Sequence, residues 1–534
     1  MYDGGMQSID RLIQGEVDVS TLALNAYSRD ASIFSVTPQA VFYPKDTNDL
    51  RSLVFQATQR RQSGDNVSLT ARNGGTCMSG GSLTESWVLD MSRYFNQISA
   101  FYLAERTIWV QGGVMHIEIE KALQNSGLLF APYTSSRDIC GIGGMIGNNA
   151  SGEKSVRYGP TSSNVETVRV MLSNGELCDF SAVTAKELEE KKQAYTLEGH
   201  LYREISKLIH EHQDTLVRHH PRVKKNAAGY PLWELWNSER TLFNLGRLFI
   251  GSQGTLGIVT DAKLHLIPIA NGNRMIVVPI KNLRDLASTV QTMLRFGPDT
   301  CETFDSHTYK LARQYYPDDA ARCQAAEGQQ MVVFAIYAGS SQKYADDLAL
   351  AAQDALQRLG QHVNWVAEPE IVESYLLIRR KSFKLLLDHP LPQTKALAFL
   401  EDSIVPIEHY GEFLASLEVI LADYRMTYTY AGHIGDGSIR LIPLANMDEP
   451  HAPELIMELA ERVYDLVFAF GGSMSVDHND GLIRTPFLEH MYGHEMVELF
   501  EKVKTLFDPL GIFNPRKKVG GSLEYSREHI VRGN

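Results

Sequence analysis

One glycine-rich stretch constrains the fold of this chain more than any other feature. Residues 132–159, PYTSSRDICGIGGMIGNNASGEKSVRYG, place glycines and small polar residues between two apolar stretches. Glycine has no Cβ and reaches positive φ at little cost, so such a backbone can lie flat against a ligand. Successive N–H groups can then face one concavity and bind phosphate oxygens. The stretch therefore predicts a phosphate-binding turn.

Two common phosphate-binding patterns do not fit this stretch. A Rossmann G-x-G-x-x-G would need glycine at position 146, where the chain has Ile146. A P-loop would need lysine after Gly152, where the chain has Glu153. We therefore expect a nucleotide-binding turn of another kind.

A second donor-rich turn lies upstream, at residues 71–82, ARNGGTCMSGGS. It follows an apolar, strand-like start at residues 67–69 and contains four glycines, three hydroxyl side chains and one arginine. A single loop of this kind is usually a plain surface turn. Two of them, about 60 residues apart, instead predict a ligand with a long polyphosphate body.

Length and composition describe an ordinary globular protein of more than one domain. The chain has 534 residues, of which 44% are hydrophobic and 22% charged. A net charge of −13 argues against nucleic acid or an anionic membrane as the main partner. No apolar run approaches the roughly 18 residues of a membrane helix, and the N-terminal residues lack the apolar core of a signal peptide. We expect a cytoplasmic location, and peripheral contact with the inner membrane stays open.

The five cysteines are scattered and form no C-x-x-C pair. This spacing excludes a zinc ribbon and a ferredoxin-type cluster. An odd, scattered set is typical of free thiols in a reducing compartment.

The apolar pattern predicts an α+β fold. Short strands and helices alternate up to residue 270, including a helix with Thr47 as its N-cap and a hairpin about Asn174-Gly175. From Asn271 onward, a β-α-β-β-α-β rhythm predicts an antiparallel sheet with helices on one face.

Six motifs, in order, resemble a known family. RNGGTCMSGG, GIGGMIGNNASG followed by RYG, and LFIGSQGTLGIVTDAKLHLIP resemble the FAD-binding domain of the vanillyl-alcohol oxidase / p-cresol methylhydroxylase (PCMH) family. AGHIGDGSIRLIPL, GGSMSVDHNDGLIRTP and FDPLGIFNPRKK resemble its FAD-linked oxidase C-terminal domain. The branch that includes D-2-hydroxyglutarate dehydrogenase, D-lactate dehydrogenase and the flavin subunit of glycolate oxidase is the most similar. The resemblance runs from about Pro38 to Val519.

The resemblance implies a two-part PCMH-type FAD-binding domain and a ferredoxin-like cap domain that binds substrate. We expect the following division of the chain: an N-terminal arm at 1–35, the FAD-binding domain at 36–270, the cap at 271–430, a segment that completes the active site and returns to the FAD domain at 431–520, and a tail at 521–534.

We expect the FAD to be bound noncovalently, because no histidine lies between residues 66 and 115 and a thiol such as Cys77 is more often a packing residue. The glycine loops predict contacts with the cofactor from Arg72, Asn73, Gly74, Gly75, Thr76, Ser79, Gly80, Gly143, Gly144, Asn148 and Asn149. The resemblance adds Pro132, Ser135, Ser151, Gly152, Ile258 and Asn514.

His478 is the best candidate for the catalytic base. Oxidation of a 2-hydroxy acid needs a base for the hydroxyl proton, and an ordinary histidine titrates near pH 6.5. Most histidines are surface or satisfied core residues. His478, however, lies in a turn, D-H-N-D-G, that matches the catalytic E-H-N-D-G-type stretch of the relatives.

The sequence departs from the family at the metal site. Relatives that bind a divalent metal use a glutamate where this chain has Asp477, and two histidines where it has His433 and Arg440. Arginine stays protonated and has no lone pair to give a metal, so we expect the metal site to be lost or weak. Arg440 either supplies the missing positive charge to the substrate, together with His433, or makes an ion pair with Asp436 or Asp477.

Arg379 is the expected anchor of the substrate carboxylate, by resemblance, with Arg380 as the alternative register. Only one residue of Arg379, Arg380 and Lys381 can face inward from a helix. We expect the neighbouring Glu401-Asp402 pair to be structural.

Together these features predict an FAD-dependent dehydrogenase of a small 2-hydroxy acid, of the D-lactate, D-2-hydroxyglutarate or glycolate type, with hydride passing to flavin N5. Electrons would pass to a quinone, a flavoprotein or an iron–sulfur protein, and the chain could form a homodimer. Two alternatives stay open: an oxidase of another alcohol or a sugar, and a catalytically silent flavoprotein subunit.

Overall fold

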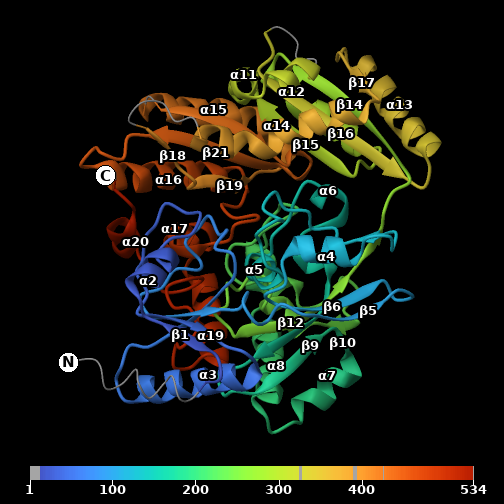
Figure 1. Ribbon diagram of the computed structural model, residues 1–534. Helices are drawn as coiled ribbons and strands as arrows, with labels where there is room; N and C mark the ends of the chain where they lie inside the picture. Colours follow the sequence, from blue (N-terminus) through green and yellow to red (C-terminus); the bar gives the residue numbers. More distant parts are fainter. Residues whose placement is uncertain (1–12, 324–327, 389–393, 425, 533–534) are drawn as a thin grey trace.

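The structure, a computed structural model, describes residues 13–323, 328–388, 394–424 and 426–532. It consists of a lower half, blue to green in Figure 1, and an upper half, yellow to orange. The C-terminal segment, in red, returns to the lower half. The predicted α+β class is confirmed. Residues 1–12 of the predicted N-terminal arm lie outside the described residues.

Two sheets form the lower half. The first has the order β1-β2-β4-β3, with β2, β4 and β3 parallel: β1 Glu16–Asp18, β2 Ala40–Tyr43, β4 Trp87–Asp90 and β3 Leu69–Arg72. The second is antiparallel, in the order β5-β6-β12-β8-β9: β5 Ile98–Tyr102, β6 Thr107–Gln111, β12 Ile258–His265, β8 Val165–Met171 and β9 Leu177–Ser181. The predicted hairpin about Asn174-Gly175 is confirmed, since β8 pairs with β9 and Gly175 has a φ of 81°.

Helix α3, Thr47–Gln62, covers the first sheet. Its apolar positions fall at helical spacing and pack into the core of that sheet: Leu50, Leu53, Val54 and Ala57. The prediction that Thr47 is the N-cap is wrong. Asp46 caps the helix, because its carboxylate accepts from two backbone N–H groups of the first turn.

The upper half is a cap built on one eight-stranded sheet, in the order β17-β14-β16-β15-β20-β21-β18, with β19 also paired to β21. Its strands are β14 Gly272–Ile280, β15 Thr300–Asp305, β16 Met331–Gly339, β17 Asn364–Val366, β18 Lys395–Ala396, β19 Leu400–Ile404, β20 Thr427–Gly432 and β21 Ser438–Ala445. The predicted β-α-β-β-α-β rhythm is interrupted, because two helices, α11 Ser306–Tyr315 and α12 Pro317–Arg322, lie between β15 and β16. The expected boundary between residues 430 and 431 lies within β20.

Helices cover both faces of the cap sheet, so the prediction of helices on one face is wrong. Helix α14, Pro369–Asp388, packs on one face with α11, Ser306–Tyr315. On the other face are α10 Leu286–Leu294, α13 Gln342–Arg358 and α15 Tyr410–Tyr424. Alternate residues of β14 show the reason: Met275 faces one core and Ile276 the other, and both are fully buried.

The remaining helices join the two halves. From the cap, α16, Ala452–Ala469, leads into a turn and then to α17 Gly481–Arg484, α18 Leu488–Tyr492, α19 His494–Phe507 and α20 Leu523–His529. Helix α19 packs against α8, Leu197–Glu211, in the lower half. Among the described residues, no helix combines the length and apolar character needed to cross a membrane.

Candidate active site

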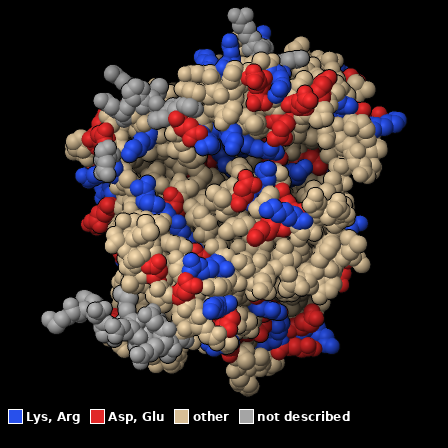
Figure 2. Space-filling view, in the orientation of Figure 1, with Lys and Arg blue, Asp and Glu red and all other residues tan. Residues whose placement is uncertain are grey.

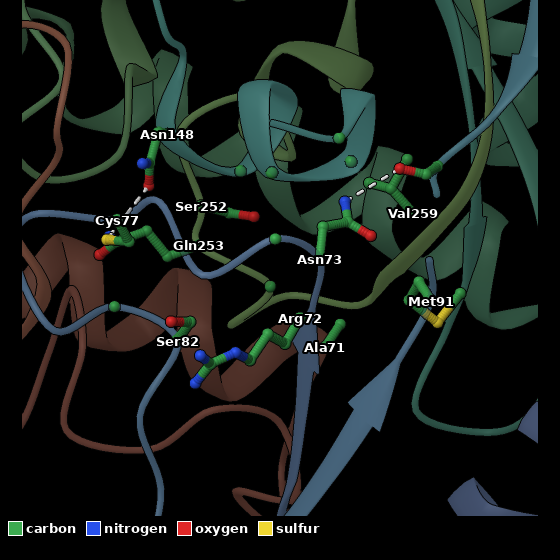
Figure 3. A pocket seen from close by; sticks show the side chains of 18 of the residues that line it. Ala71, Arg72, Asn73, Cys77, Ser82, Met91, Asn148, Ser252, Gln253 and Val259 are labelled. Carbon is green, nitrogen blue, oxygen red and sulfur yellow. Dashed lines mark hydrogen bonds between the residues drawn. The ribbon is translucent and has the colours of Figure 1, made fainter. Parts of the chain in front are cut away.

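The two glycine loops contact each other at Gly74, because a Cβ there would lie 1.9 Å from the carbonyl oxygen of Ile139 in the second loop. Within the second loop, a Cβ on Gly152 would lie 1.9 Å from the carbonyl oxygen of Tyr133. No side chain fits at such distances. Asn73 of the first loop donates from Nδ2 to the carbonyl of Gly112, just after β6, at 3.0 Å (Figure 3). The loops therefore form one continuous surface.

A cavity of about 560 Å³ runs from these loops to the cap, and a smaller one of about 100 Å³ lies between the first loop and α5, Ile142–Asn148. Figure 2 shows the face of the molecule hollowed between the two halves, with Lys and Arg side chains along the upper edge. The following predicted cofactor residues line these cavities: Arg72, Asn73, Gly74, Gly75, Thr76, Ser135, Gly143, Gly144, Asn148, Ser151 and Gly152.

Six other predicted cofactor residues lie behind the cavity walls: Pro132, Ser79, Gly80, Asn149, Ile258 and Asn514. Asn514 shows why, because its Nδ2 donates to the carbonyls of Gly81 and Gln253 at 2.8 and 2.7 Å. Ser79 donates to the carbonyl of His478 at 2.8 Å. These side chains hold the loops in place, and their contact with the cofactor stays a prediction.

The loops fit a dinucleotide. Their walls are backbone and small polar side chains, and the Oδ1 atom of Asn73 is buried without a hydrogen-bond partner among the described residues. A buried polar atom of this kind is normally satisfied by a ligand or a water.

At the cap end of the cavity, adjacent strands bring three polar residues together. Glu302 is on β15, His433 follows β20 and Arg440 is on β21. The register pairs Thr303 with Gly432 and Ala431 with Arg440, so the three residues are neighbours on the sheet. All three side chains line the cavity.

Arg379 enters this cluster from α14. Its Nε lies 2.6 Å from Oε2 of Glu302, whose Oε1 lies 2.6 Å from Nδ1 of His433. Burial raises the pKa of Glu302 to about 8, against the opposing charge of Arg379. Burial and the charges of Arg379, Arg440 and Lys225 lower the pKa of His433 well below its ordinary value. His433 is therefore a neutral imidazole at neutral pH.

The prediction that only one residue of this basic cluster faces inward is wrong, because Arg379 and Arg380 both line the cavity. The two arginines differ in their partners. Arg380 forms a two-point ion pair with Glu153 of the second loop, at 2.8 and 2.7 Å, and a further pair with Glu373 at 2.9 Å. Arg379 is the buried one, 5% exposed. Lys381 is not among the lining residues.

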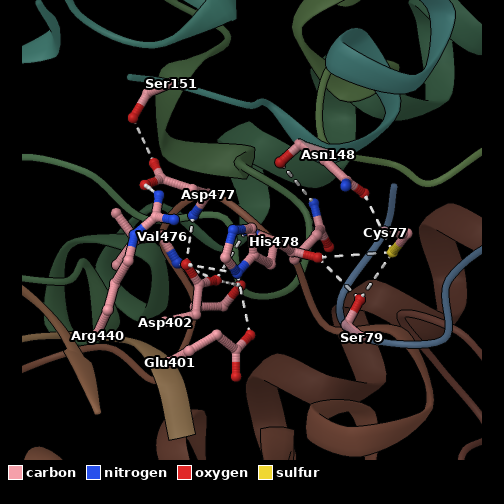
Figure 4. A network of polar contacts seen from close by, with 12 residues as sticks. Cys77, Ser79, Asn148, Ser151, Glu401, Asp402, Arg440, Val476, Asp477 and His478 are labelled. Atoms are coloured by element: carbon pink, nitrogen blue, oxygen red, sulfur yellow. Dashed lines mark hydrogen bonds and ion pairs between the residues drawn. The ribbon is translucent and has the colours of Figure 1, made fainter. Parts of the chain in front are cut away.

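Asp477 pairs with two cations, Lys225 and Arg440; Figure 4 shows Arg440 beside it. Lys225 lies 3.2 Å from its Oδ1, and Nη2 of Arg440 lies 3.3 Å from its Oδ2. Ser151 donates to Oδ1 as well. Burial opposes ionisation, but Lys225 and Arg440 hold the pKa of Asp477 well below its ordinary value. Lys225 also pairs with Asp436 at 3.2 Å, which connects the lower half to the cap.

His478 lies on the turn between α16 and α17, beside the cavity. Asp402 shapes this turn, because its carboxylate accepts from the backbone N–H groups of Val476, Asp477 and His478 at 2.8 to 2.9 Å (Figure 4). Nδ1 of His478 lies 3.0 Å from Oε1 of Glu401. The structural role expected for the Glu401-Asp402 pair holds for Asp402, whereas Glu401 contacts the candidate base.

Sequence reasoning missed Glu302, Lys225 and Arg484. Glu302 and Lys225 lie outside the six motifs, and Arg484 lies inside GGSMSVDHNDGLIRTP, where the resemblance marks only the turn at His478. Only burial identifies them: all three are less than 5% exposed, and buried charges are normally paired at a specific site.

The fold and the cavity define a two-domain flavoprotein, with a nucleotide-binding lower half and a cap that closes one end of the cofactor cavity. Comparison with known families agrees: residues 38–181 match the FAD binding domain, and residues 270–518 match FAD linked oxidases, C-terminal domain. These ranges together span well over half of the chain. The protein belongs to the FAD-linked oxidase family.

Two relatives and one solved structure illustrate the similarity. D-2-hydroxyglutarate dehydrogenase of Escherichia coli (strain K12) is 28% identical over 92% of this chain and 49% of its own length. Glycolate oxidase subunit GlcD of Bacillus subtilis (strain 168) is 24% identical over 94% of this chain and 93% of its own. The structure of 4-ethylphenol oxidase from Gulosibacter chungangensis shares the fold, with a TM-score of 0.69 at 16% identity and 97% coverage of both chains. The chain spans about half the length of the E. coli relative.

Proposed function

We propose that this protein is an FAD-dependent dehydrogenase that oxidises a small 2-hydroxy acid, of the D configuration, to the 2-oxo acid. One observation carries the proposal: a single cavity joins both glycine loops to a cap cluster that contains two arginines and to the candidate base His478. The names of relatives, among them D-2-hydroxyglutarate dehydrogenase and a glycolate oxidase subunit, support this class of substrate.

Arg379 and Arg440 would hold the substrate carboxylate. Arg379 is fixed through its Nε by Glu302, so its terminal nitrogens face His433 and the cavity. Nε of Arg440 is buried without a hydrogen-bond partner among the described residues. Guanidinium groups bind carboxylates in a planar, two-point geometry. His433 would complete this pocket as a neutral side chain.

His478 would accept the proton of the substrate hydroxyl. Its Nδ1 is turned toward Glu401, and its side chain reaches the cavity. Bound FAD supplies the hydride acceptor, N5 of its ring. Glu302, Arg379 and His433 at the cap end are at most 5% exposed, and such burial strengthens ionic contacts to a bound substrate.

A divalent metal does not fit the residues at the position of the family's metal site. The guanidinium of Arg440 lies 3.3 Å from both Nε2 of His433 and Oδ2 of Asp477, and so fills the space between them. The other oxygen of Asp477 is taken by Lys225 and Ser151. Among the described residues, no group of three or more metal-ligating side chains is present. We propose that Arg440 supplies the positive charge in place of a metal.

The reduced flavin would pass its electrons to a quinone or to a protein acceptor, a flavoprotein or an iron–sulfur protein.

An anaerobic bleaching screen tests the proposal. Purified protein, reconstituted with FAD, is mixed with D- and L-2-hydroxy acids, sugars and aromatic alcohols, with and without chelator. Loss of the visible flavin absorbance with hydroxy acids alone, unaffected by chelator, supports the proposal. Bleaching by sugars or aromatic alcohols instead would favour an oxidase of another alcohol. Bound FAD that no compound reduces would indicate a silent flavoprotein subunit.

A further inference from the structure

Glu401, on β19, is a buried carboxylate with two partners on one oxygen. Its Oε1 accepts from Nη2 of Arg484 at 2.7 Å and lies 3.0 Å from Nδ1 of His478. Arg484 also donates from Nη1 to the backbone carbonyl of Asn479 at 2.8 Å. Glu401 and Arg484 are both 0% exposed and lie behind the cavity wall, whereas His478 lines the cavity. Any effect of this pair on a ligand must therefore pass through His478.

The charge state of Glu401 fixes the direction of its hydrogen bond to His478. Burial by itself acts to raise the pKa of Glu401, but the charge of Arg484 and the hydrogen bond from His478 lower it to about 2. An ionised carboxylate only accepts hydrogen bonds. Nδ1 of His478 must then carry the hydrogen, and the lone pair of the neutral ring is on Nε2.

Asp402 holds the turn independently of Glu401. Its two carboxylate oxygens take the backbone N–H groups of residues 476–478, and Ser79 donates to the carbonyl of His478. The backbone position of the histidine is thus set by other residues. Oδ1 of Asp402 lies 3.8 Å from Nδ1 of His478, beyond hydrogen-bond distance, whereas Oε1 of Glu401 lies 3.0 Å from it. What remains for Glu401 is therefore the orientation and tautomer of the ring.

A second row of contacts joins the same residue types, Arg379, Glu302 and His433, and provides a contrast. There the arginine, the glutamate and the histidine all line the cavity, so each can meet a ligand directly. In the row of contacts that ends at His478, only the histidine lines the cavity. This difference separates a ligand-binding arrangement from one that orients a single ring.

We propose that Glu401, clamped by Arg484, is a positioning residue that holds His478 as the Nδ1–H tautomer and so leaves Nε2 as the proton acceptor. The tautomer rests on the contacts above; the acceptor role rests on the proposed function.

The tautomer can be measured without any substrate. In FAD-loaded protein labelled with ¹⁵N-histidine, the His478 signals are assigned by their loss in His478→Asn. We expect hydrogen on Nδ1 and none on Nε2. The variant Glu401→Leu/Arg484→Met, which removes the carboxylate together with its cation, should lose this preference while it retains FAD. A wild-type ring with hydrogen on Nε2, or an unchanged tautomer in the double variant, would overturn the proposal.

Kinetics test the consequence for catalysis. With an acid found by the bleaching screen, Glu401→Gln should slow flavin reduction about 10- to 100-fold, the usual effect of losing a partner behind a reacting group, with little change in substrate affinity. In a His478→Asn background the same substitution should change the rate by less than about threefold, because residues that act through one another are not additive. If the rate losses of Glu401→Gln and His478→Asn were additive in the double variant, Glu401 would not act through His478.

Asp299→Asn is the matched control. Asp299 is a buried carboxylate, 2% exposed, that pairs with Arg157 outside the cavity, and its loss should leave flavin reduction unchanged. If Glu401→Gln does not fold, the Glu401→Leu/Arg484→Met pair takes its place in both measurements. Should no acid bleach the flavin, the proposed function fails, while the tautomer measurement still decides the role of Glu401.

Discussion

Replacing Arg379 by methionine should impair substrate binding far more than replacing its neighbour Arg380. Truncating one partner of a buried charge pair costs about 2–5 kcal/mol. The lower end applies here, since a pKa of about 8 keeps Glu302 mostly protonated at neutral pH, so that the loss of Arg379 leaves no unpaired charge on Glu302. A loss of about 2–3 kcal/mol corresponds to a decrease of about 30- to 150-fold in kcat/KM.

The assay is anaerobic flavin reduction over a range of concentrations of a hydroxy acid from the screen, which separates affinity from rate. Arg379→Met should weaken apparent affinity while FAD stays bound. Lys381→Met, from the same helix but not from the cavity wall, serves as the control and should behave as wild type. If Arg379→Met binds substrate like wild type, or if Arg380→Met loses as much, the assignment of the carboxylate anchor is refuted.

Three further predictions follow from other contacts. Arg440→His restores the two-histidine pattern, but Lys225 still pairs with the carboxylate of Asp477. We therefore expect no gain in bound metal by elemental analysis and no turnover that a chelator inhibits. Lys225→Met leaves two buried carboxylates, Asp436 and Asp477, without their shared cation; it should destabilise the protein by about 3–5 kcal/mol, visible as a lower Tm, and an unchanged Tm would contradict the pairing. The stability that Glu401 contributes is fully present above its ordinary pKa of 4.5 and is lost as pH falls toward its pKa of about 2 in the folded protein. The difference in Tm between wild type and Glu401→Gln should therefore narrow between pH 5 and pH 3. A Tm difference that stays constant over this range would refute this reasoning.

The sequence predicted the parts of the site that depend on local chain geometry. Glycine spacing located both loops, because close approach of two backbones leaves no room for a Cβ at positions such as Gly74 and Gly152. The turn at His478 was found by its resemblance to the family. The α+β class followed from apolar periodicity, whereas the two helices between β15 and β16 were not part of the predicted β-α-β-β-α-β rhythm.

Strand β15 shows why other parts were missed. Its sequence, TCETFD, has neither the alternation of a half-exposed strand nor a continuous apolar run, yet all six residues are buried. The strand lies inside a sheet covered on both faces, and Glu302 is tolerated there only because Arg379 and His433 meet it from segments 77 and 131 residues away along the chain. Such long-range compensation leaves no local pattern in the sequence.

Under the proposed function, Arg440 in the place of a metal ligand would change what the rest of the site must do. A metal ion can coordinate a hydroxyl oxygen and lower its pKa directly. A guanidinium can only donate hydrogen bonds and present a fixed positive charge. The removal of the hydroxyl proton would then depend more heavily on the proposed base, His478. We expect His478→Ala to slow flavin reduction about 10²- to 10⁴-fold with FAD still bound, and added imidazole, which fits the space left by the side chain, to restore part of the rate. A His478→Ala variant that reduces its flavin at the wild-type rate would show that another group takes the proton and that the arginine has not shifted this task to His478.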